Sequence, residues 1–313
     1  MRRALVTGGA GFIGSHLVRT LHAQGVGVRV VDNFVTGHKE NLAGVPVEVL
    51  EGDIRDREVV RRAVGGVDWV FHLAAMISVP GSMADPLTCY EVNVDGSLNV
   101  LWEAHQAAVK RVVMSSSAAV YGDAAGPLDE TSPQKPQSPY AGSKRAMEAL
   151  GELFSAVYGL ETVSLRYFNV YGPRQDPHSA YAAVIPAFLS NLLDGTPLTI
   201  EGDGLQTRDF VFVGDVVKAN CLAAEAEGVG GEVYNIAGGL SVSILDLARE
   251  MMRMLGMEAR PQFGPARPGD VRSSSADIRI ARQRLGYEPS VSLADGLAQT
   301  AEWFRQVQKT SKS

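Results

Sequence analysis

A tyrosine and a lysine that lie four residues apart are the side chains of this sequence best placed to carry out chemistry. Tyr140 and Lys144 belong to the stretch YAGSK, and on a helix this spacing places both side chains on one face, with the ammonium beside the phenol. At an effective dielectric constant of about 20 and a separation of about 6 Å, one positive charge favours the phenolate by about 2.8 kcal/mol, or about two pKa units. We therefore expect Lys144 to lower the pKa of Tyr140 from about 10 to about 8, toward the range in which a general base works best.

The same pair is common on solvated helix faces, so its surroundings decide whether it is catalytic. Three serines, Ser115 to Ser117, precede it and follow an apolar strand predicted for residues 111–114. A serine at the end of a strand is often only a turn or cap residue. The hypothesis of a catalytic site therefore rests on the combination of serine, tyrosine and lysine.

A glycine-rich turn near the start of the chain predicts the class of cofactor that such a base would serve. An apolar strand predicted for residues 3–7 is followed at once by Gly8, Gly11 and Gly14, and a helical pattern runs over residues 12–23. Strand, glycine turn and helix in this order are the context of a dinucleotide site. Gly11 would let the backbone approach a pyrophosphate at the helix N-terminus, and Gly14 would let the helix pack closely on the strand.

An acidic residue at the end of the next strand indicates which dinucleotide is bound. The strand predicted for residues 28–31 ends at Asp32, eighteen residues after Gly14, near the separation expected of an acid that binds the ribose 2′-hydroxyl. Because a carboxylate repels a 2′-phosphate, we expect NAD rather than NADP. Lys39 in the following loop argues against this choice, and Asp32 could instead only cap a turn.

The alternation of strands and helices predicts the fold class. Further strands are expected at 47–50, 69–73 and 111–114, with helices at 57–64 and 93–108. This order is typical of an α/β fold with a doubly wound parallel sheet of Rossmann type, covered by helices on both faces. Ligands of such sheets bind beyond the carboxyl ends of the strands. The residues predicted at that edge are Gly11, Asp32, Asp53, Ala74 and Ser115.

Composition and charge argue against several classes of partner. The chain has 313 residues, is 45% apolar and carries a formal net charge of −6, a profile typical of soluble globular proteins and without the clustered Lys and Arg that nucleic-acid binding needs. No apolar run approaches the roughly 18 residues of a membrane span, and the first residues lead into a strand rather than a signal peptide, so we expect a cytoplasmic protein with no membrane partner. Cys89 and Cys221 lie far apart and the six histidines lack metal-ligand spacing, so no disulfide and no metal site are expected.

Short motifs in a consistent order carry a resemblance that covers nearly the whole chain. In chain order they are TGGAGFIGSH, DN at Asp32, GDI around Asp53, FHLAA from Phe71, SSSAAVYG from Ser115, YAGSK from Tyr140, RYFNVYGPRQ from Arg166, RDFVFVGDV from Arg208 and RPGDV from Arg267. By these motifs the sequence resembles the extended short-chain dehydrogenase/reductases, and within them the nucleotide-sugar 4-epimerases of the UDP-glucose 4-epimerase type. The resemblance implies bound NAD and a UDP-sugar substrate.

The resemblance also implies a role for each matching residue of the catalytic and cofactor sites. Tyr140 would be the base, Lys144 its activator and a ribose anchor, and Ser117 the hydrogen-bond partner of the sugar 4-hydroxyl. The cofactor-binding residues that it implies are Gly8, Gly11, Phe12, Ile13, Gly14, Asp32, Asn33, Asp53, Ile54, Leu73, Ala74, Ala75, Asn93, Ser115, Tyr140, Lys144 and Tyr167.

The substrate residues implied in the same way lie in the second half of the chain, apart from Ser117 and Tyr140. Asn169 and Arg208 would hold the diphosphate, and Arg267 and Asp270 would face the uridine ribose and phosphate. Either arginine could instead be an ordinary surface residue. Some family members carry a large aromatic residue where this chain has Ser274, so the serine would leave room for a 2-acetamido group unless it is only a loop residue.

The implied activity is NAD-dependent epimerisation at C4 of a UDP-hexose through a transient 4-keto sugar, for UDP-glucose and UDP-galactose and also for UDP-GlcNAc and UDP-GalNAc. Related 4,6-dehydratases and UDP-glucuronate decarboxylases carry an acidic residue before the VYG turn, whereas Ser117-Ala118-Ala119 has none, which argues against both reactions. A UDP-glucuronate or UDP-galacturonate 4-epimerase stays open, as does an NAD-dependent nucleotide-sugar dehydrogenase or reductase that would release NADH. A regulator that only senses dinucleotide would usually have lost Tyr140 or Lys144, and both are present.

Two domains and a dimer complete these expectations. Residues 1–169 are expected to form the NAD-binding domain, rejoined by about 209–236, because a strand and a helix in that range should return to the main sheet. Residues 170–313 are expected to form the UDP-sugar-binding domain. A homodimer, in which the helices at 93–108 and 140–156 pair with their copies, is implied by the resemblance alone.

Overall fold

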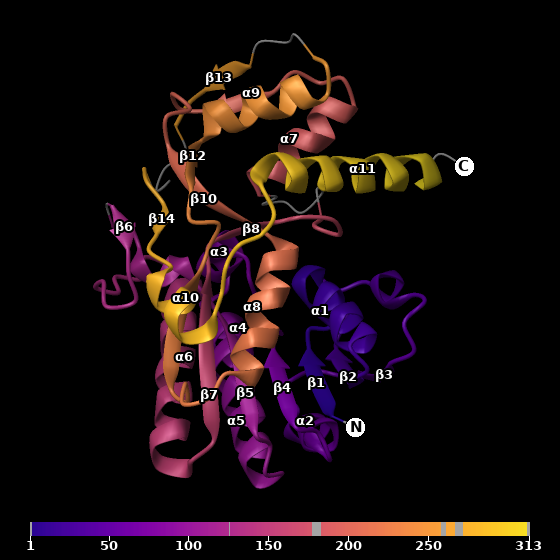
Figure 1. The fold of residues 1–313 in the computed structure, drawn as a ribbon, viewed down its shortest axis with the longest axis vertical. Helices are drawn as coiled ribbons and strands as arrows, with labels where there is room; N and C mark the ends of the chain where they lie inside the picture. The colour runs from indigo at the N-terminus through magenta and orange to yellow at the C-terminus, as the bar shows by residue number, and fades with distance from the viewer. Residues whose placement is uncertain (1, 125, 177–182, 258–260, 267–271, 312–313) are drawn as a thin grey trace.

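A seven-stranded parallel sheet forms the centre of the molecule, in the order β11-β7-β5-β4-β1-β2-β3 (Figure 1). The computed structural model describes residues 2–124, 126–176, 183–257, 261–266 and 272–311. The strands of the sheet are β1 (Arg3–Thr7), β2 (Gly27–Asp32), β3 (Glu48–Glu51), β4 (Trp69–His72), β5 (Arg111–Ser117), β7 (Glu161–Tyr167) and β11 (Glu232–Ile236), and every pairing among them is parallel. The strand order reverses between β1 and β4, which is where doubly wound sheets bind their ligands. The predicted fold class is confirmed.

Helices cover both faces of this sheet. The first face carries α1 (Phe12–Ala23) and α8 (Val213–Glu225), and the second carries α2 (Arg57–Val64), α5 (Gly96–Gln106) and α6 (Pro139–Tyr158). Because both faces are buried, central strands are apolar along nearly their whole length. The helix expected at 93–108 is divided, since a π-helical turn, η2 (Glu91–Asp95), leads into α5 and the helix ends two residues earlier. Two short helices, α3 (Val79–Ala84) and α4 (Pro86–Tyr90), precede η2.

The sequence of α6 fixes where this helix begins and therefore where Tyr140 lies. Ser138 is the N-cap, and its hydroxyl accepts a hydrogen bond from the Ala141 backbone N–H at 3.1 Å. Pro139 occupies the first helical position, where its missing N–H costs nothing. The helix ends at Tyr158 and is capped by Gly159, whose φ of 68° is left-handed. Tyr140 therefore lies in the first turn of α6.

A smaller lobe lies beyond the carboxyl ends of the central strands, at the top of Figure 1. Its sheet has the order β12-β10-β8, and its apolar core is separate from the two cores of the main sheet. Its main elements are β8 (Asn169–Tyr171), α7 (Val184–Leu193), β9 (Thr199–Glu201), β10 (Thr207–Phe212), β12 (Ser241–Ser243), α9 (Ile244–Met254), β13 (Gln262–Gly264) and α11 (Leu293–Ser311). The short pieces η1 (Lys39–Leu42), η3 (Ala118–Tyr121), β6 (Pro127–Leu128), β14 (Ser275–Ala276) and α10 (Arg279–Leu285) complete the described elements.

The return of the chain to the main sheet differs in one respect from the expectation. The helix α8 packs on the main sheet and β11 joins its edge beside β7, but the strand before them, β10, pairs with β8 and β12 in the smaller sheet. Phe210 and Phe212 on β10 belong to the core of the smaller lobe, whereas Val211 belongs to a core of the main sheet. Apolar residues on both faces therefore left the choice of sheet undetermined by the sequence.

Neither a membrane-spanning helix nor a cluster of metal-binding side chains is found in the described part of the chain. None of the helices in that part of the chain is both long and apolar enough to cross a membrane. No cluster of three or more His, Cys, Asp or Glu side chains within it could hold a metal ion.

Candidate active site

The serine, tyrosine and lysine singled out by sequence come together where β5 meets the first turns of α6. The Lys144 ammonium donates a hydrogen bond to the Ser115 carbonyl oxygen at 2.7 Å, and Nζ lies 5.9 Å from the centre of the Tyr140 ring. The backbone N–H of Tyr140 donates to the Ser82 hydroxyl at 3.1 Å, which ties α6 to α3. Sequence reasoning did not find Ser82, which lies far from the serine, tyrosine and lysine motifs in sequence.

The electrostatics of the pair differ from the expectation in direction. Burial raises the pKa of Tyr140, and a hydrogen bond with the Ser117 hydroxyl opposes this shift. Burial lowers the pKa of Lys144 to about 8. The expected pKa of about 8 for Tyr140 counted the attraction of the lysine charge but no cost of removing the phenolate from water, and in the chain alone that cost is the larger.

The glycine turn between β1 and α1 has a shape that only glycine permits. Gly8 has a left-handed φ of 69°, and a Cβ added to Gly14 would lie 2.1 Å from the Gly8 carbonyl oxygen. Gly11 is the N-cap of α1, so the backbone N–H groups of Phe12 and Ile13 begin the helix beside it. The turn therefore brings the N-terminus of a helix to the switch point of the sheet, as a pyrophosphate site requires.

Asp32, at the end of β2, holds this turn in place. Its side chain is 7% exposed, and its two carboxylate oxygens accept hydrogen bonds from the backbone N–H groups of Ala10 at 2.9 Å and Phe34 at 2.8 Å. Asp32 therefore caps a turn, and its place at the end of β2 is also the one expected for a ribose ligand, which stays a prediction. Lys39, the residue that argued for NADP, is ion-paired with Glu51 at 2.8 Å.

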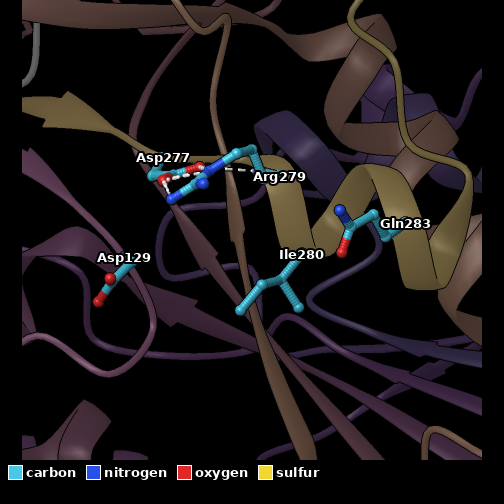
Figure 2. A pocket seen from close by; sticks show the side chains of 5 residues that line it. All are labelled: Asp129, Asp277, Arg279, Ile280 and Gln283. Carbon is cyan, nitrogen blue, oxygen red and sulfur yellow. Dashed lines mark hydrogen bonds and ion pairs between the residues drawn. The ribbon is translucent and has the colours of Figure 1, made fainter.

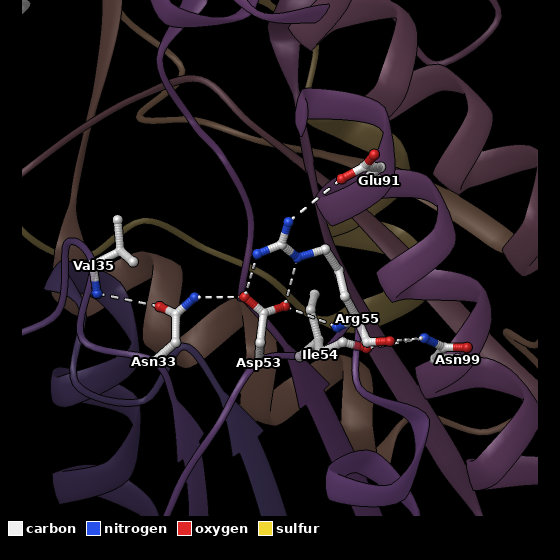
Figure 3. Close-up of polar contacts among 7 residues, drawn as sticks. All are labelled: Asn33, Val35, Asp53, Ile54, Arg55, Glu91 and Asn99. Atoms are coloured by element: carbon white, nitrogen blue, oxygen red, sulfur yellow. Dashed lines mark hydrogen bonds and ion pairs between the residues drawn. The ribbon is translucent and has the colours of Figure 1, made fainter. Parts of the chain in front are cut away.

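A second acidic group lies at the end of β3, in the network of Figure 3. The carboxylate of Asp53 accepts hydrogen bonds from the Asn33 amide at 2.9 Å and from the Arg55 guanidinium on both oxygens. The hydrogen bond from Arg55 is the main reason that the pKa of Asp53 falls to about 2. Arg55 also reaches Glu91 on η2 at 3.4 Å, and the Asn99 amide donates to the backbone carbonyl oxygens of Ile54 and Arg55. Asp53 is therefore a fixed anion.

Three of the predicted cofactor residues make hydrogen bonds that hold elements of the fold together. Asn93 is 1% exposed, and its amide exchanges hydrogen bonds with both backbone groups of Met76 and donates to the Ser143 hydroxyl at 2.9 Å. Ala74 donates its backbone N–H to the Thr7 hydroxyl at 3.2 Å. The Tyr167 hydroxyl donates to Asn220 on α8 at 3.0 Å. The remaining predicted backbone positions of this group, Leu73 and Ala75, follow β4.

The substrate residues that the structure describes lie along the junction between β8, β10 and β14. Asn169 donates from its amide to the Asp209 carbonyl oxygen at 3.0 Å and to the Ser274 hydroxyl at 3.5 Å. Arg208 is half-buried and donates to the Thr207 carbonyl oxygen at 2.8 Å. Asn169 and Ser274 are thus brought together from positions far apart in sequence. Arg267 and Asp270 lie outside the described residues.

A buried residue that the sequence analysis missed lies directly behind the catalytic candidates. Glu148 follows Lys144 by four residues on α6 and is 5% exposed. It is paired with Arg166 on β7 at 2.8 Å. The signal that could have found it is the spacing itself, since Tyr140, Lys144 and Glu148 repeat every four residues along one helix face.

A surface hollow of about 210 Å³ lies elsewhere, where α10 begins (Figure 2). Its lining residues are Asp129, Asp277, Arg279, Ile280 and Gln283. Arg279 and Asp277 form an ion pair at 2.6 Å. No predicted site residue lines this hollow, and we assign it no part in the chemistry.

Comparisons with known proteins agree with this arrangement. The model of the NAD dependent epimerase/dehydratase family matches residues 4–237. A UDP-glucose 4-epimerase of Mycolicibacterium smegmatis is 42% identical over 310 residues, covering 97% of this chain and 98% of the relative. A UDP-N-acetyl-alpha-D-glucosaminuronate decarboxylase of Bacillus cytotoxicus is 34% identical over 323 residues, covering 98% and 99%. Among solved structures, a UDP-N-acetylglucosamine 4-epimerase of Methanobrevibacter ruminantium in complex with UDP-N-acetylmuramic acid has a TM-score of 0.94 and 39% identity, covering 98% of this chain and 99% of the other.

Proposed function

The chain belongs to the NAD dependent epimerase/dehydratase family, and from that premise we propose that it interconverts UDP-glucose and UDP-galactose by epimerisation at C4. The observation that carries the proposal is the junction of β5 and α6, where Lys144 Nζ lies 5.9 Å from the centre of the Tyr140 ring and the Ser117 hydroxyl opposes the rise that burial causes in the pKa of Tyr140. A phenol with a hydroxyl and an ammonium as neighbours suits reversible proton transfer to a sugar hydroxyl.

NAD is the cofactor of this family, and the residues of this chain fit it. A Cβ at Gly8 or Gly14 would clash with the backbone of the protein itself, so these two glycines permit the tight turn and the close helix–strand packing of a dinucleotide site. The backbone at the start of α1 would hold the pyrophosphate, Asp32 a ribose 2′-hydroxyl, and Lys144 the other ribose. When bound, NAD supplies the acceptor and later the donor of the C4 hydride.

The protein side chains then handle the proton and hold the substrate. Tyr140 Oη accepts the proton of the C4 hydroxyl as the 4-keto sugar forms, and Ser117 Oγ orients that hydroxyl by a hydrogen bond. Asn169 and Arg208 hold the diphosphate while the hexose turns about it. Tyr140 Oη then returns the proton to the C4 oxygen. The hydride that the bound cofactor would return would reach C4 from the other face of the turned sugar, so the configuration is inverted and no external redox partner is needed.

The absence of a carboxylate beside Ser117 favours epimerisation over the other reactions found among the relatives. One relative is named as a decarboxylase and another, from Streptomyces niveus, as a dTDP-glucose 4,6-dehydratase. Those reactions need acid/base chemistry at the sugar C5 position. In this chain Ser117 is followed by Ala118 and Ala119 on η3, and the next carboxylate along the chain, Asp123, is exposed beyond Gly122.

The hydroxyl of Ser274 supports acceptance of sugars with a 2-acetamido group. Ser274 lies within 3.5 Å of the Asn169 amide, so the serine is next to a predicted diphosphate ligand rather than in a remote loop. A small side chain there leaves space that an aromatic ring would fill. The similar structure of a UDP-N-acetylglucosamine 4-epimerase agrees with this proposal.

A homodimer is supported by apolar side chains exposed on the helices α3 to α6, which pack on one another. We call these side chains the apolar face: Met83, Leu87, Tyr90, Leu98, Leu153 and Val157. Leu87 is 77% exposed and Val157 is 63% exposed, which is unusual for several large apolar side chains on neighbouring helices. A second copy that presents its own α5 and α6 would cover them.

The decisive experiment gives the purified protein one nucleotide sugar at a time. UDP-glucose, UDP-galactose, UDP-GlcNAc, UDP-GalNAc and UDP-glucuronate are incubated separately, and the products are separated by chromatography while NADH absorbance is followed. We expect interconversion of the first pair and of the N-acetylated pair, with no net NADH. Release of NADH in proportion to substrate would favour a dehydrogenase instead, and conversion of UDP-glucuronate alone would favour the glucuronate epimerase.

A further inference from the structure

We propose that the buried pair of Glu148 and Arg166 is a positioning device that sets the geometry of Ser117, Tyr140 and Lys144. Both side chains are nearly inaccessible, with exposed fractions of 5% and 3%. Arg166 donates from Nε to one carboxylate oxygen of Glu148 at 2.9 Å and from Nη2 to the other at 2.8 Å. This two-point contact fixes the orientation of both side chains.

The pair connects to the strand that carries the catalytic serine. The Ser116 hydroxyl donates a hydrogen bond to Glu148, and Ser116 is the neighbour of Ser117 at the end of β5. The Gln134 amide donates to the second oxygen of Glu148 at 3.0 Å. Four donors therefore satisfy the carboxylate, and one of them holds the backbone immediately before Ser117.

Arg166 extends the network to the turn that follows the catalytic serine. Its Nη1 donates to the Tyr121 hydroxyl at 2.7 Å and to the Glu130 carbonyl oxygen at 3.1 Å. Tyr121, the last residue of η3, donates in turn to the Asn235 amide oxygen on β11 at 2.7 Å. The segment with Ser117 is thus held by Ser116 on one side and by Tyr121 on the other.

The same pair acts on the helix that carries the base. Glu148 lies one helical turn beyond Lys144, and its negative charge supports the charged form of that lysine, which burial disfavours. Arg166 is the counter-ion of Glu148. Tyr121 faces the pair from η3, the half-buried Glu130 faces it from the segment after β6, and Ser116 faces it from β5. A break in this network would let α6 shift against β5 and would weaken the contacts of Lys144 and Ser117 with Tyr140.

The test compares a single variant and a double variant for stability and for catalysis. Glu148→Gln leaves the Arg166 charge buried without its partner, so its thermal midpoint should fall. The double variant Glu148→Leu/Arg166→Met removes both charges, and such apolar replacements are often neutral for stability. We expect this double variant to regain the wild-type thermal midpoint and bound NAD while kcat stays at least about tenfold low, with KM for UDP-glucose changed less than about twofold.

Two readouts separate positioning from simple stability. The pH at which kcat reaches half its maximum should move upward in the double variant, because a phenol that loses its neighbours binds its proton more tightly. Ultraviolet titration of the NAD-free protein gives the pKa of Tyr140 directly, as the difference between a protein and the same protein with Tyr140→Phe. This pKa should be higher in the double variant than in the wild type. The matched control is Arg111→Met/Glu161→Leu, which removes an ion pair at the opposite end of β5 and should leave kcat and its pH profile unchanged.

A double variant with wild-type kcat and pH profile would overturn the proposal. Should the double variant fail to fold, Ser116→Ala decides, since it removes only the hydrogen bond to Glu148. We expect its kcat to be about threefold to tenfold lower at an unchanged thermal midpoint, and a wild-type kcat would count against the device. The inference rests on the proposed epimerase activity, but the two fail differently, because an error in that activity would appear as a wild-type protein without turnover.

Discussion

A half-buried phenol has to release a proton easily for the proposed chemistry to proceed. Burial raises the pKa of Tyr140, and only the hydroxyl of Ser117 opposes it within the chain. The pKa of Lys144, lowered to about 8 by burial, still leaves this side chain mostly protonated near neutral pH. A cofactor that adds a second positive charge beside the phenol would complete the lowering that Lys144 alone does not achieve.

Replacing Tyr140 by phenylalanine tests the assignment of the base. Tyr140→Phe removes the only proposed proton acceptor and leaves the ring, so we expect kcat for UDP-galactose to fall by about 10²- to 10⁴-fold, the range typical of a lost general base. Bound NAD, measured by absorbance after release, should stay at the wild-type level. Tyr158→Phe on the exposed end of the same helix is the control and should keep wild-type kcat. A fully active Tyr140→Phe would rule out the mechanism.

Replacing Gly14 by alanine tests the shape of the cofactor turn. The new Cβ would lie 2.1 Å from the Gly8 carbonyl oxygen, so the backbone must move and α1 must shift away from β1. We expect stability to fall by about 1–3 kcal/mol and bound NAD to be lost during purification. Gly27→Ala is the control, because its Cβ would meet only ordinary contacts beginning at 3.5 Å. Retention of NAD by Gly14→Ala would contradict the assignment of this turn.

The residue types and spacings were sufficient to predict much of the site but not its electrostatic state. Glycine spacing and the position of Asp32 are local properties, and the structure shows the turn with the shape that they imply. The pKa of Tyr140 depends on burial by elements distant in sequence, which no spacing reveals. The contacts of Asp32 with the backbone of the turn and the pairing of Glu148 with Arg166 depend on tertiary structure in the same way.

At the scale of elements, the site depends on contacts between the lobe and the main sheet. His16 on α1 donates from Nε2 to the Pro173 carbonyl oxygen at 2.8 Å, beyond the end of β8. The strand β10 packs apolar residues into the cores of both parts. Sequence patterns predicted β1 to β4, α1 and α2 within a residue. They ended β5 three residues early and did not predict β7 or β11. They could not decide which sheet takes a strand that is apolar on both faces.

The contact of His16 should make stability depend on pH. Burial lowers the pKa of His16 to about 4 from an ordinary value of 6.5. Because the unfolded chain then binds the proton more readily, the contribution of His16 is complete above about pH 6.5 and is lost as the pH falls toward about 4. We expect the free energy of unfolding of the wild type to fall by about 2 kcal/mol more than that of His16→Gln across this range.

Urea denaturation at a series of pH values measures this difference. His22→Gln changes an exposed histidine on the same helix and should follow the wild type. If the free energy of unfolding of the wild type and of His16→Gln changed with pH in the same way, His16 would not be held neutral between the two parts of the molecule.

At the scale of the whole molecule, the main sheet carries the proposed cofactor turn and the proposed base, while the smaller lobe carries the predicted diphosphate ligands. This division suits a reaction in which the nucleotide is held and the sugar turns. The boundary expected at residue 169 stays a prediction, because strands and helices continue to alternate beyond it. The apolar face lies on helices that cover the main sheet. Each of these helices also has apolar residues that pack on the sheet, so the sequence could not show which apolar side chains stay exposed.

The apolar face yields the last prediction, on the assembly of the protein. The double variant Leu98→Arg/Val157→Arg places one charge on α5 and one on α6, where a second copy would bury them. Burying unpaired charges costs several kcal/mol. We expect light scattering after size exclusion to give twice the chain mass for the wild type and the single-chain mass for the double variant. Val49→Arg on β3 is the control. Val49 is as exposed as Leu98, at 41% against 42%, but it lies on β3 at the edge of the main sheet and outside the apolar face. A wild type that is monomeric at micromolar concentration, or a double variant that still has twice the chain mass, would show that these helices do not form the interface.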